Sequence, residues 1–339
     1  MERILLVSFL LVQQRYTIEE LTMNNQTQIQ ELYDQFLIKY PRDFNIDPIG
    51  YDKRLKVFQE NVLLIEKSNY ESSSAVYEIT KFADWTENEF DAFSRPLIAS
   101  KNRTFHHYDH DWIRIAHDGS PYPSTWDWRL EGVITAVKTQ SICEYVSAYQ
   151  CNSCYAYAVA AVVESLFAIK YNQFISISEH EMVDCDLTNF GCWSGSTKKS
   201  MLRGKYIGFT HMMDYPVMLE TRSFCPLRGQ FFIKNLYRID PHADAIAWFV
   251  SHNGPAVLNF VFPKQYKFYK SGILSDAYEC WIMTPNHAAA VVGYGMENGR
   301  KYWIIKNSWG DWWGEQGFFR IERGTNACQV ENYPASASL

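Results

Sequence analysis

Three cysteines, Cys143, Cys151 and Cys154, lie within twelve positions, and the chain then becomes apolar and rich in alanine and valine. If Ser153 caps a helix that begins here, Cys154 lies in the first turn of that helix. The helix dipole and the unpaired backbone N–H groups of a first turn stabilise an anion, so the pKa of a thiol there can fall below its usual ~8.5. With a histidine to shuttle its proton, such a thiolate is a nucleophile. Cys154 is therefore a candidate nucleophile.

Other chemistry is compatible with the CNSC stretch at 151–154. A zinc site would need a second pair of cysteines at short spacing, whereas six residues separate Cys185 from Cys192. A thioredoxin-like redox pair would follow a strand in a small βαβ domain, and this region does not have that pattern. Structural disulfides stay open as the alternative to a nucleophile.

The composition is that of a globular chain, with 339 residues of which 47% are hydrophobic and 16% aromatic. Its net charge of −6 argues against nucleic acid as the main partner, because phosphate binding needs a basic face. The largely apolar run 4–12 predicts a signal peptide over residues 1–16, and no other segment is expected to span a membrane. A truncated or mispredicted N-terminus is the alternative. Glycosylation sequons at Asn25 and Asn102 also favour the secretory pathway.

The region 26–93 is expected to be helical. One stripe of residues in it recurs at intervals of three and four, which places the whole stripe on one face of a helix. The stripe consists of Arg54, Phe58, Asn61, Ile65 and Asn69. An arginine and two asparagines on that face predict either a polar network at a helix crossing or an ordinary amphipathic helix. Thr86 is expected to be the N-cap of a further helix.

The composition and hydrophobic pattern of the sequence change after residue 93. The segment 94–122 is irregular, polar and bounded by prolines, which predicts an exposed linker between two domains. The run 154–170 is apolar almost all round and predicts a buried central helix. Beyond about residue 230, short β-like runs follow one another. The expected fold class is therefore α+β, with two lobes and a cleft between them.

Five blocks in the second part of the chain resemble, in order, the signature blocks of the papain-like cysteine peptidases. They are "STWDWRLEGVITAVKTQ", "CNSCYAYA", "SEHEMVDCDLTNFGC", "NHAAAVVGYG" and "KYWIIKNSWGDWWGEQGFFRIERG", within about residues 123–334. The helical region before them resembles the inhibitory propeptide of the cathepsin L type. The stripe fits its long-helix motif, with Gly50 where glutamate is usual, and Phe82 and Asp84 fit its second motif.

The resemblance implies roles for four residues. Cys154 would be the nucleophile, and His287 the base that holds it as a thiolate–imidazolium pair. Asn307 would bond the other ring nitrogen of His287 and fix the orientation of the ring, and Trp309 would shield that hydrogen bond from water. The resemblance also implies three disulfide bonds. These are Cys151–Cys192, Cys185–Cys225 and Cys280–Cys328. Cys143 then has no implied partner.

The oxyanion hole is the main departure from the family pattern. There, a glutamine six residues before the nucleophile donates its amide to the tetrahedral intermediate. Gln140 has the matching context "VKTQ" but stands fourteen residues before Cys154, whereas Gln150 stands four residues before it in the wrong context. We prefer Gln140, with the eight extra residues forming a surface loop. A retained intron fragment or a faulty gene model would give the same sequence.

Several other cleft positions also differ from the family pattern. Asn152 replaces a glycine, Tyr155 replaces a tryptophan, and Trp193 and Ser194 replace small residues, whereas Gly195 is kept where the backbone pairs with substrate. The substrate-binding residues that the resemblance implies are Gly195, Ser194, Ala288 and, as the floor of the pocket for the side chain two residues before the cut, Tyr333.

The resemblance implies a papain-like two-lobed fold, with a helical left lobe and a β-barrel-like right lobe over residues 123–339. Residues 26–93 would be the inhibitory propeptide, and the linker 94–122 would hold the activation site. The implied function is that of a secreted or lysosomal cysteine endopeptidase, a monomer that cleaves protein or peptide substrates without metal or cofactor. Its own propeptide and cystatin-type inhibitors would bind the cleft. The alternative, favoured by the altered Gln140 region, is a catalytically impaired homologue that binds proteins.

Overall fold

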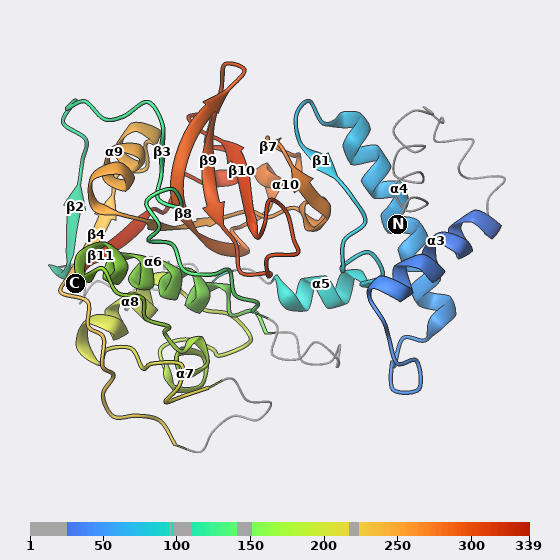
Figure 1. Cartoon of the computed structure of the whole chain (residues 1–339), viewed down its shortest axis with the longest axis horizontal. Coiled ribbons are helices and arrows are strands. Elements are labelled where there is room, and N and C mark those ends of the chain that lie inside the picture. The colour runs from blue at the N-terminus through green and yellow to red at the C-terminus, as the bar shows by residue number, and fades with distance from the viewer. Residues whose placement is uncertain (1–25, 95–96, 98–109, 141–150, 217–223) are drawn as a thin grey trace.

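The computed structural model describes residues 26–94, 97, 110–140, 151–216 and 224–339 (Figure 1). Several sequence predictions lie outside the described residues. These concern the signal peptide, both glycosylation sequons, Cys143, Gln150 and the eight extra residues before Cys151.

The N-terminal region, residues 26–94, is mainly helical, as predicted. Its elements are α3 (Gln26–Lys39), α4 (Tyr51–Glu71), the short strand β1 (Val76–Tyr77) and α5 (Glu87–Phe93). The predicted stripe lies on α4, and its first four members are buried. The fifth, Asn69, is exposed but exchanges two 2.8 Å hydrogen bonds with the backbone of Tyr77. Thr86 is the N-cap of α5, as predicted, and it also forms a capping box with Glu89.

The rest of the chain combines helices with one large sheet. Its α-helices are α6 (Cys154–Tyr171), α7 (Glu179–Cys185), α8 (Thr197–Tyr206), α9 (Ala243–Asn253) and α10 (Glu279–Ile282), and its 3-10 helices are η2 (Lys264–Phe268) and η3 (Ala327–Gln329). Its strands are β2 (Trp112–Ile115), β3 (Trp126–Asp127), β4 (Asn235–Ile239), β5 (Ala256–Phe260), β6 (Tyr269–Ser271), β7 (Ile273–Leu274), β8 (His287–Glu297), β9 (Arg300–Lys306), β10 (Phe318–Glu322) and β11 (Ala335–Ser338).

The main sheet has nine strands in the order β2-β4-β11-β5-β8-β9-β10-β7, with β3 paired to β8. The central strand β8 pairs antiparallel with both β5 and β9, and nine of its eleven residues are buried. Strand β2 lies in the segment that we expected to be irregular linker, where it pairs in parallel with β4 at the sheet edge. The expected linker is therefore not irregular throughout.

Two hydrophobic clusters form the core, which agrees with the predicted two lobes. One cluster surrounds α6, which is buried along most of its length as predicted. Among the described helices α6 alone is long and apolar enough to span a membrane, but 72% of that window is buried inside the protein. The other cluster joins the β-rich part to the N-terminal region.

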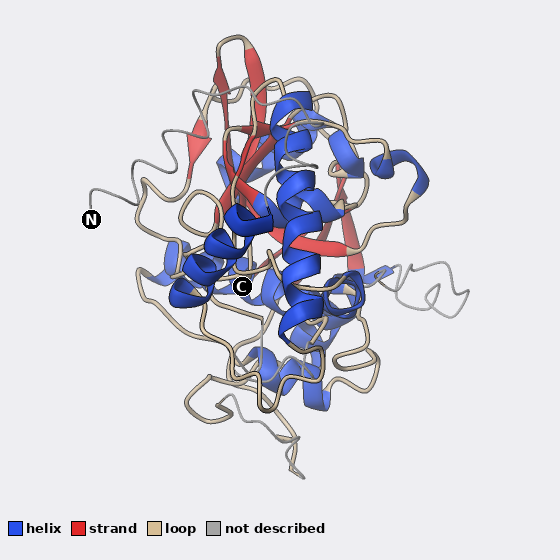
Figure 2. Ribbon diagram, turned by 90° about the vertical axis from the view of Figure 1, so that its right-hand side faces the viewer, coloured by secondary structure: helices blue, strands red, loops and turns tan. Residues whose placement is uncertain are grey.

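The N-terminal region packs against the β-rich side of the molecule. Strand β1 pairs antiparallel with β6, and α5 extends from the α3–α4 pair towards the centre (Figure 1). Seen from that side, the helices of this region lie in front of the sheet (Figure 2). The path of α5 brings the segment that follows it to the predicted catalytic residues.

Candidate active site

Cys154 is the first residue of α6, as the sequence predicted, and its side chain is completely buried. The preceding Ser153 is the N-cap residue but makes no side-chain capping bond, so the first-turn N–H groups are not taken up by its hydroxyl. The thiol donates to the Oδ1 atom of Asn152, 3.6 Å from its sulfur. Among the described residues, Cys154 is the only cysteine outside a disulfide.

His287 and Asn307 are brought together by adjacent strands. His287 begins β8, and Asn307 directly follows β9. Asn307 Oδ1 accepts from His287 Nε2 at 2.8 Å, which leaves the other ring nitrogen, Nδ1, as an acceptor. That Nδ1 atom is buried and makes no hydrogen bond within the described part of the chain. The ring is thus oriented for proton transfer, but its proton-accepting atom is unused.

Both reactive groups are held in their neutral forms in this structure. Burial raises the pKa of the Cys154 thiol to about 12, although backbone N–H groups of Ala288 and Tyr155 act in the opposite direction. Burial lowers the pKa of His287 to about 4, with a smaller upward effect from Asn307. Our expectation of a lowered thiol pKa is therefore wrong for this covered state, because desolvation outweighs the helix start. A thiolate–imidazolium pair requires the site to be uncovered.

Trp309 packs on the face of the candidate site where we expected an aromatic shield. Its ring centroid is 5.2 Å from that of His287, and the side chain is 1% exposed. Phe262 contacts both rings, with centroids 5.2 Å from His287 and 4.9 Å from Trp309. Apolar rings around the His287–Asn307 bond keep water from competing for it.

Gln140 is anchored close to the nucleophile. Its backbone N–H donates to Ser308 at 2.8 Å, and its Oε1 accepts from the Ser308 hydroxyl at 2.6 Å. These bonds turn the Nε2 donor towards two carbonyl oxygens, those of Cys151 and Phe93, each 3.4 Å away. An amide donor that bonds a peptide carbonyl beside the nucleophile has the geometry expected of an oxyanion-hole residue.

The N-terminal region covers the candidate site directly. Phe82 and Phe93 lie against Trp309, with ring centroids at 5.2 and 5.5 Å. Beyond α5, the Ser94 hydroxyl bonds the Asn286 carbonyl at 3.4 Å, and the Leu97 N–H donates to Pro285 at 2.9 Å. The chain therefore passes over the site and continues past it, and this cover explains why Cys154 and His287 are both buried.

The predicted substrate-binding residues fall into two groups. The backbone of Ala288 contacts Cys154, and Gly195 is buried against Tyr155, whose ring a Cβ atom at position 195 would overlap. Ser194 is half-buried, and its backbone carbonyl accepts the Phe190 N–H at 3.1 Å. Tyr333, in contrast, is 44% exposed although the cleft is covered. Its assignment as a pocket floor stays a prediction without support from this exposure.

The disulfides join the same three cysteine pairs that the resemblance implies. They are Cys151–Cys192, Cys185–Cys225 and Cys280–Cys328. The first ties the turn before Cys154 to the loop that carries Ser194 and Gly195. This bond therefore fixes two walls of the candidate cleft against each other.

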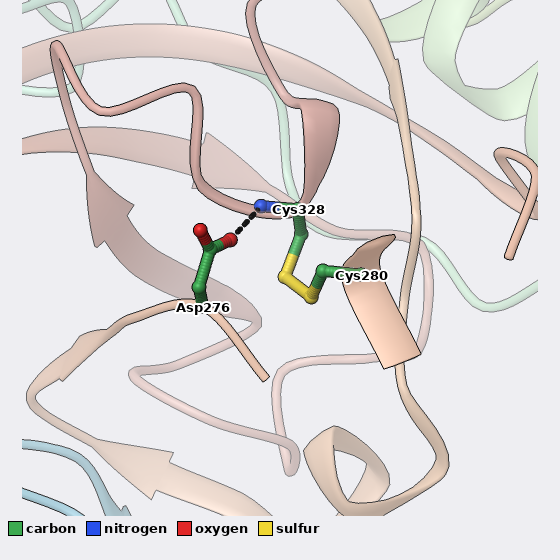
Figure 3. A group of neighbouring side chains, drawn as sticks. All are labelled: Asp276, Cys280 and Cys328. Atoms are coloured by element: carbon green, nitrogen blue, oxygen red, sulfur yellow. Dashed lines mark hydrogen bonds between the residues drawn. A yellow bond between two sulfur atoms is a disulfide. The ribbon is translucent and has the colours of Figure 1, made fainter. Parts of the chain in front are cut away.

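One group of potential metal ligands occurs among the described residues: Asp276, Cys280 and Cys328 (Figure 3). Both cysteines form a disulfide with each other, and Asp276 Oδ1 accepts the Cys328 N–H at 2.6 Å. The aspartate thus stabilises the backbone next to the disulfide, and the donor set does not suit a metal ion.

Sequence reasoning missed two residues that matter for the site and its cover. Asn152 was noted only as a replacement for glycine, yet its side chain contacts the nucleophile. Asp47 was not singled out, yet it forms an ion pair with the buried Arg54, whose guanidinium also bonds Glu89 at 2.8 Å. Asp47 thus supplies a carboxylate where Gly50 replaces the usual glutamate. A search for acidic residues near the start of α4 could have found it.

Comparisons with known proteins show which family the chain resembles. Residues 122–338 match the papain family cysteine protease domain, and residues 33–90 match the cathepsin propeptide inhibitor domain. The chain is 30% identical over 323 residues to the viral cathepsin of Adoxophyes honmai nucleopolyhedrovirus, covering 91% of each chain. It is 31% identical to that of Spodoptera exigua nuclear polyhedrosis virus, covering 98% of each.

Solved structures show the same likeness over most of the chain. A digestive procathepsin L2 proteinase from Tenebrio molitor larval midgut superposes with a TM-score of 0.81 at 25% identity, covering 92% of this chain and all of that one. The proform of the ragweed pollen allergen Amb a 11, a cysteine protease, gives a TM-score of 0.77 at 26% identity, covering 96% of each. Both are proforms, in keeping with the covered site described above.

Proposed function

Because this chain belongs to the papain family of cysteine proteases and carries a cathepsin propeptide inhibitor domain, we propose that it is an endopeptidase whose nucleophile is Cys154. The observation that carries the proposal is the 2.8 Å bond between His287 Nε2 and Asn307 Oδ1, which leaves Nδ1 as the proton acceptor beside α6. Once the N-terminal region leaves, both reactive groups are hydrated and the cost of charging them falls.

The proposed reaction uses these residues in two steps. His287 takes the thiol proton, and the Cys154 sulfur attacks the substrate carbonyl carbon. Gln140 Nε2 and the Cys154 backbone N–H donate to the resulting oxyanion, and His287 passes the proton to the leaving amine as the C–N bond breaks. Water, deprotonated by His287, then hydrolyses the thioester and restores the thiol.

Two features support cleavage within a chain rather than at its end. Phe90 packs on Trp309 and the Leu97 N–H donates to the Pro285 carbonyl, so the N-terminal region does not end in the cleft. The carbonyl of Phe93 meets the Gln140 donor, as a scissile carbonyl would. This segment thus acts as an inhibitor of the cleft, which other protein inhibitors of the cystatin type would also enter.

The proposed life cycle is that of a zymogen in the secretory pathway. Cathepsin-like papain proteases are usually lysosomal or secreted, and we place this chain, as a monomer, in one of these two compartments. Acid would loosen the N-terminal region, and a cut in 94–122 would release it. Incubation at pH 4 to 5, alone and with a mature cathepsin, tests this step. A precursor that stays intact in both contradicts it.

The first experiment is labelling of the acid-treated protein with a peptidyl epoxide, followed by mass spectrometry of the modified peptide. We expect label on Cys154 that is lost in His287→Ala, and cleavage of an internally quenched peptide blocked at both ends. Label on Cys143 would contradict the assignment of the nucleophile. A folded, processed protein without label would instead be a binding module of the papain fold.

A further inference from the structure

Asn152 occupies a position where the family pattern has no side chain. It lies in the turn before α6, two residues before the nucleophile, and its own side chain is completely buried. Its backbone N–H donates to the Cys192 carbonyl at 3.0 Å, next to the Cys151–Cys192 disulfide. The backbone at Asn152 is therefore fixed, and its carboxamide is confined to the space beside the sulfur.

The neighbours of the carboxamide determine which of its ends faces the sulfur. The Trp193 carbonyl can only accept a hydrogen bond, and Asn152 Nδ2 donates to it at 3.5 Å. This arrangement leaves Oδ1 facing the Cys154 sulfur, 3.6 Å away. A carbonyl oxygen there can accept from a thiol but has nothing to donate to a thiolate.

We propose that Asn152 is a positioning residue that holds Cys154 as a protonated thiol and so restricts when the nucleophile can form. In the structure Asn152 Oδ1 is the hydrogen-bond acceptor of the thiol, while His287 Nδ1 has no partner among the described residues. To become a thiolate, the sulfur must give up its hydrogen bond to Asn152 and pass its proton to His287. Alternatively, the carboxamide must turn over and give up its bond to the Trp193 carbonyl. Both changes oppose formation of the thiolate.

This effect belongs to the protease domain and not to its cover. The bonds from Asn152 to the Cys192 and Trp193 carbonyls and the neighbouring disulfide lie within residues 151 to 193, which remain after the N-terminal region leaves. From the packed elements, the backbone groups of Ala288 on β8 and Tyr155 on α6 act on the Cys154 thiol, and His287 is the residue before Ala288 on β8. Burial raises the pKa of Tyr155, so His287 is the titrating group in this set at mildly acidic pH.

The test uses the processed enzyme and measures the rate of alkylation by iodoacetamide from pH 3 to pH 9. In Asn152→Gly, which restores the residue usual in the family, we expect the acid-side midpoint to fall by about one pH unit, the size of one hydrogen bond to the thiol. Turnover at pH 5 should rise several-fold. Asn152→Asp should move the midpoint upwards, because a carboxylate repels the thiolate. Asn235→Ala, which removes an amide that bonds Ser338 at 3.0 Å in β4, is the matched control and should leave the midpoint unchanged.

Each result decides the inference, which rests on the proposed role of Cys154 as the nucleophile. An unchanged midpoint in Asn152→Gly overturns it, because the contact then has no effect on the thiol. A higher midpoint also overturns it, since Asn152 would then donate to the thiolate. If Cys154 of the wild-type enzyme does not react at any pH, the proposed function itself fails.

Discussion

Two buried groups of ionisable side chains in this molecule differ in charge state. In the N-terminal region, the guanidinium of Arg54 is completely buried but bonds both Asp47 and Glu89. In the cleft, Cys154 and His287 are equally buried, yet they form no hydrogen bond with each other and burial drives both towards neutrality. The first group stays charged because its charges are paired, whereas the second stays neutral because its charges are not.

The paired charges have a structural role, whereas the unpaired groups in the cleft have a chemical one. Paired charges fix the crossing of α4 with the segment before α5, and so give the N-terminal region a definite shape with which to cover the cleft. The unpaired groups in the cleft gain nothing from ionising while they are covered. Inhibition is therefore electrostatic as well as steric: the cover removes the water that the ion pair needs.

The largest effect should come from removing the centre of the charged group. Arg54→Met keeps most of the side-chain volume but leaves Asp47 and Glu89 without their cation, so we expect the N-terminal region to lose about 3 to 5 kcal/mol of stability. Urea unfolding of the full chain in a Cys154→Ala background, which prevents self-cleavage, measures this loss.

Arg114→Met is the matched control, because Arg114 pairs with Asp240 on the surface at 2.6 Å. That pair is exposed and should contribute little. A loss of less than about 1 kcal/mol in Arg54→Met would mean that the buried network does not stabilise the cover.

The next effect is acid weakening of the covered state through His287. Its pKa is about 4 when covered, against about 6.5 when exposed to water. The neutral ring is thus favoured by covering, so its contribution is complete above pH 6.5 and is lost as the pH falls towards 4. The loss should reach about 3 kcal/mol, since each pKa unit corresponds to about 1.4 kcal/mol.

Urea unfolding at pH 7, 6, 5 and 4 checks this, with Cys154→Ala compared to Cys154→Ala combined with His287→Gln. The ion pairs Lys264–Glu87 and Lys270–Glu78 between the cover and the protease domain are present in both chains and cancel in the difference. Parallel pH curves for the two chains would show that His287 is not the acid-sensitive group.

A smaller effect is expected where one carboxylate of the charged group is neutralised. Burial by itself raises the pKa of Asp47, but hydrogen bonds from Arg54 and from the Ile49 backbone outweigh it, and the net pKa is lowered. Asp47 therefore stabilises the folded chain at pH values above the ordinary carboxyl pKa of about 4, and this stability is lost on further acidification. Asp47→Asn keeps an acceptor and should lose about 2 kcal/mol at pH 7.

The same unfolding assay checks this change, with the exposed Asp43→Asn as control. The gap between Asp47→Asn and wild type should close as the pH falls below 4. A gap that is constant down to pH 3 would mean that Asp47 acts through packing rather than charge.

Sequence reasoning was sufficient where one element determines the result. The spacing of Arg54, Phe58 and Asn61 predicted the buried face of α4, and the apolar run after Ser153 predicted α6 with Cys154 at its start. Both depend on helical periodicity, which is local. The family resemblance added His287 and Asn307, which lie on separate strands and could not be paired from spacing alone.

The remainder depended on contacts between segments distant in the chain. The raised thiol pKa results from the burial of Cys154 among several packed segments, and the Asp47–Arg54 pair results from the path of a loop. The role of Gln140 stays a prediction, although its amide does lie 3.4 Å from the Cys151 carbonyl. The orientation of Asn152 was not predictable, since it depends on where the Trp193 carbonyl points.

The smallest effect should come from a charge pair that spans the two regions at the surface. Lys264 bonds Glu87 at 3.2 Å, but the two side chains are 51% and 69% exposed. Water and salt screen such a pair, so Lys264→Ala should weaken the cover by less than about 1 kcal/mol, and the difference should vanish at high salt. Urea unfolding of the full chain at low and at high salt measures this difference. If Lys264→Ala matched Arg54→Met in size, the contrast between paired buried charges and exposed ones would not explain how the cover is held.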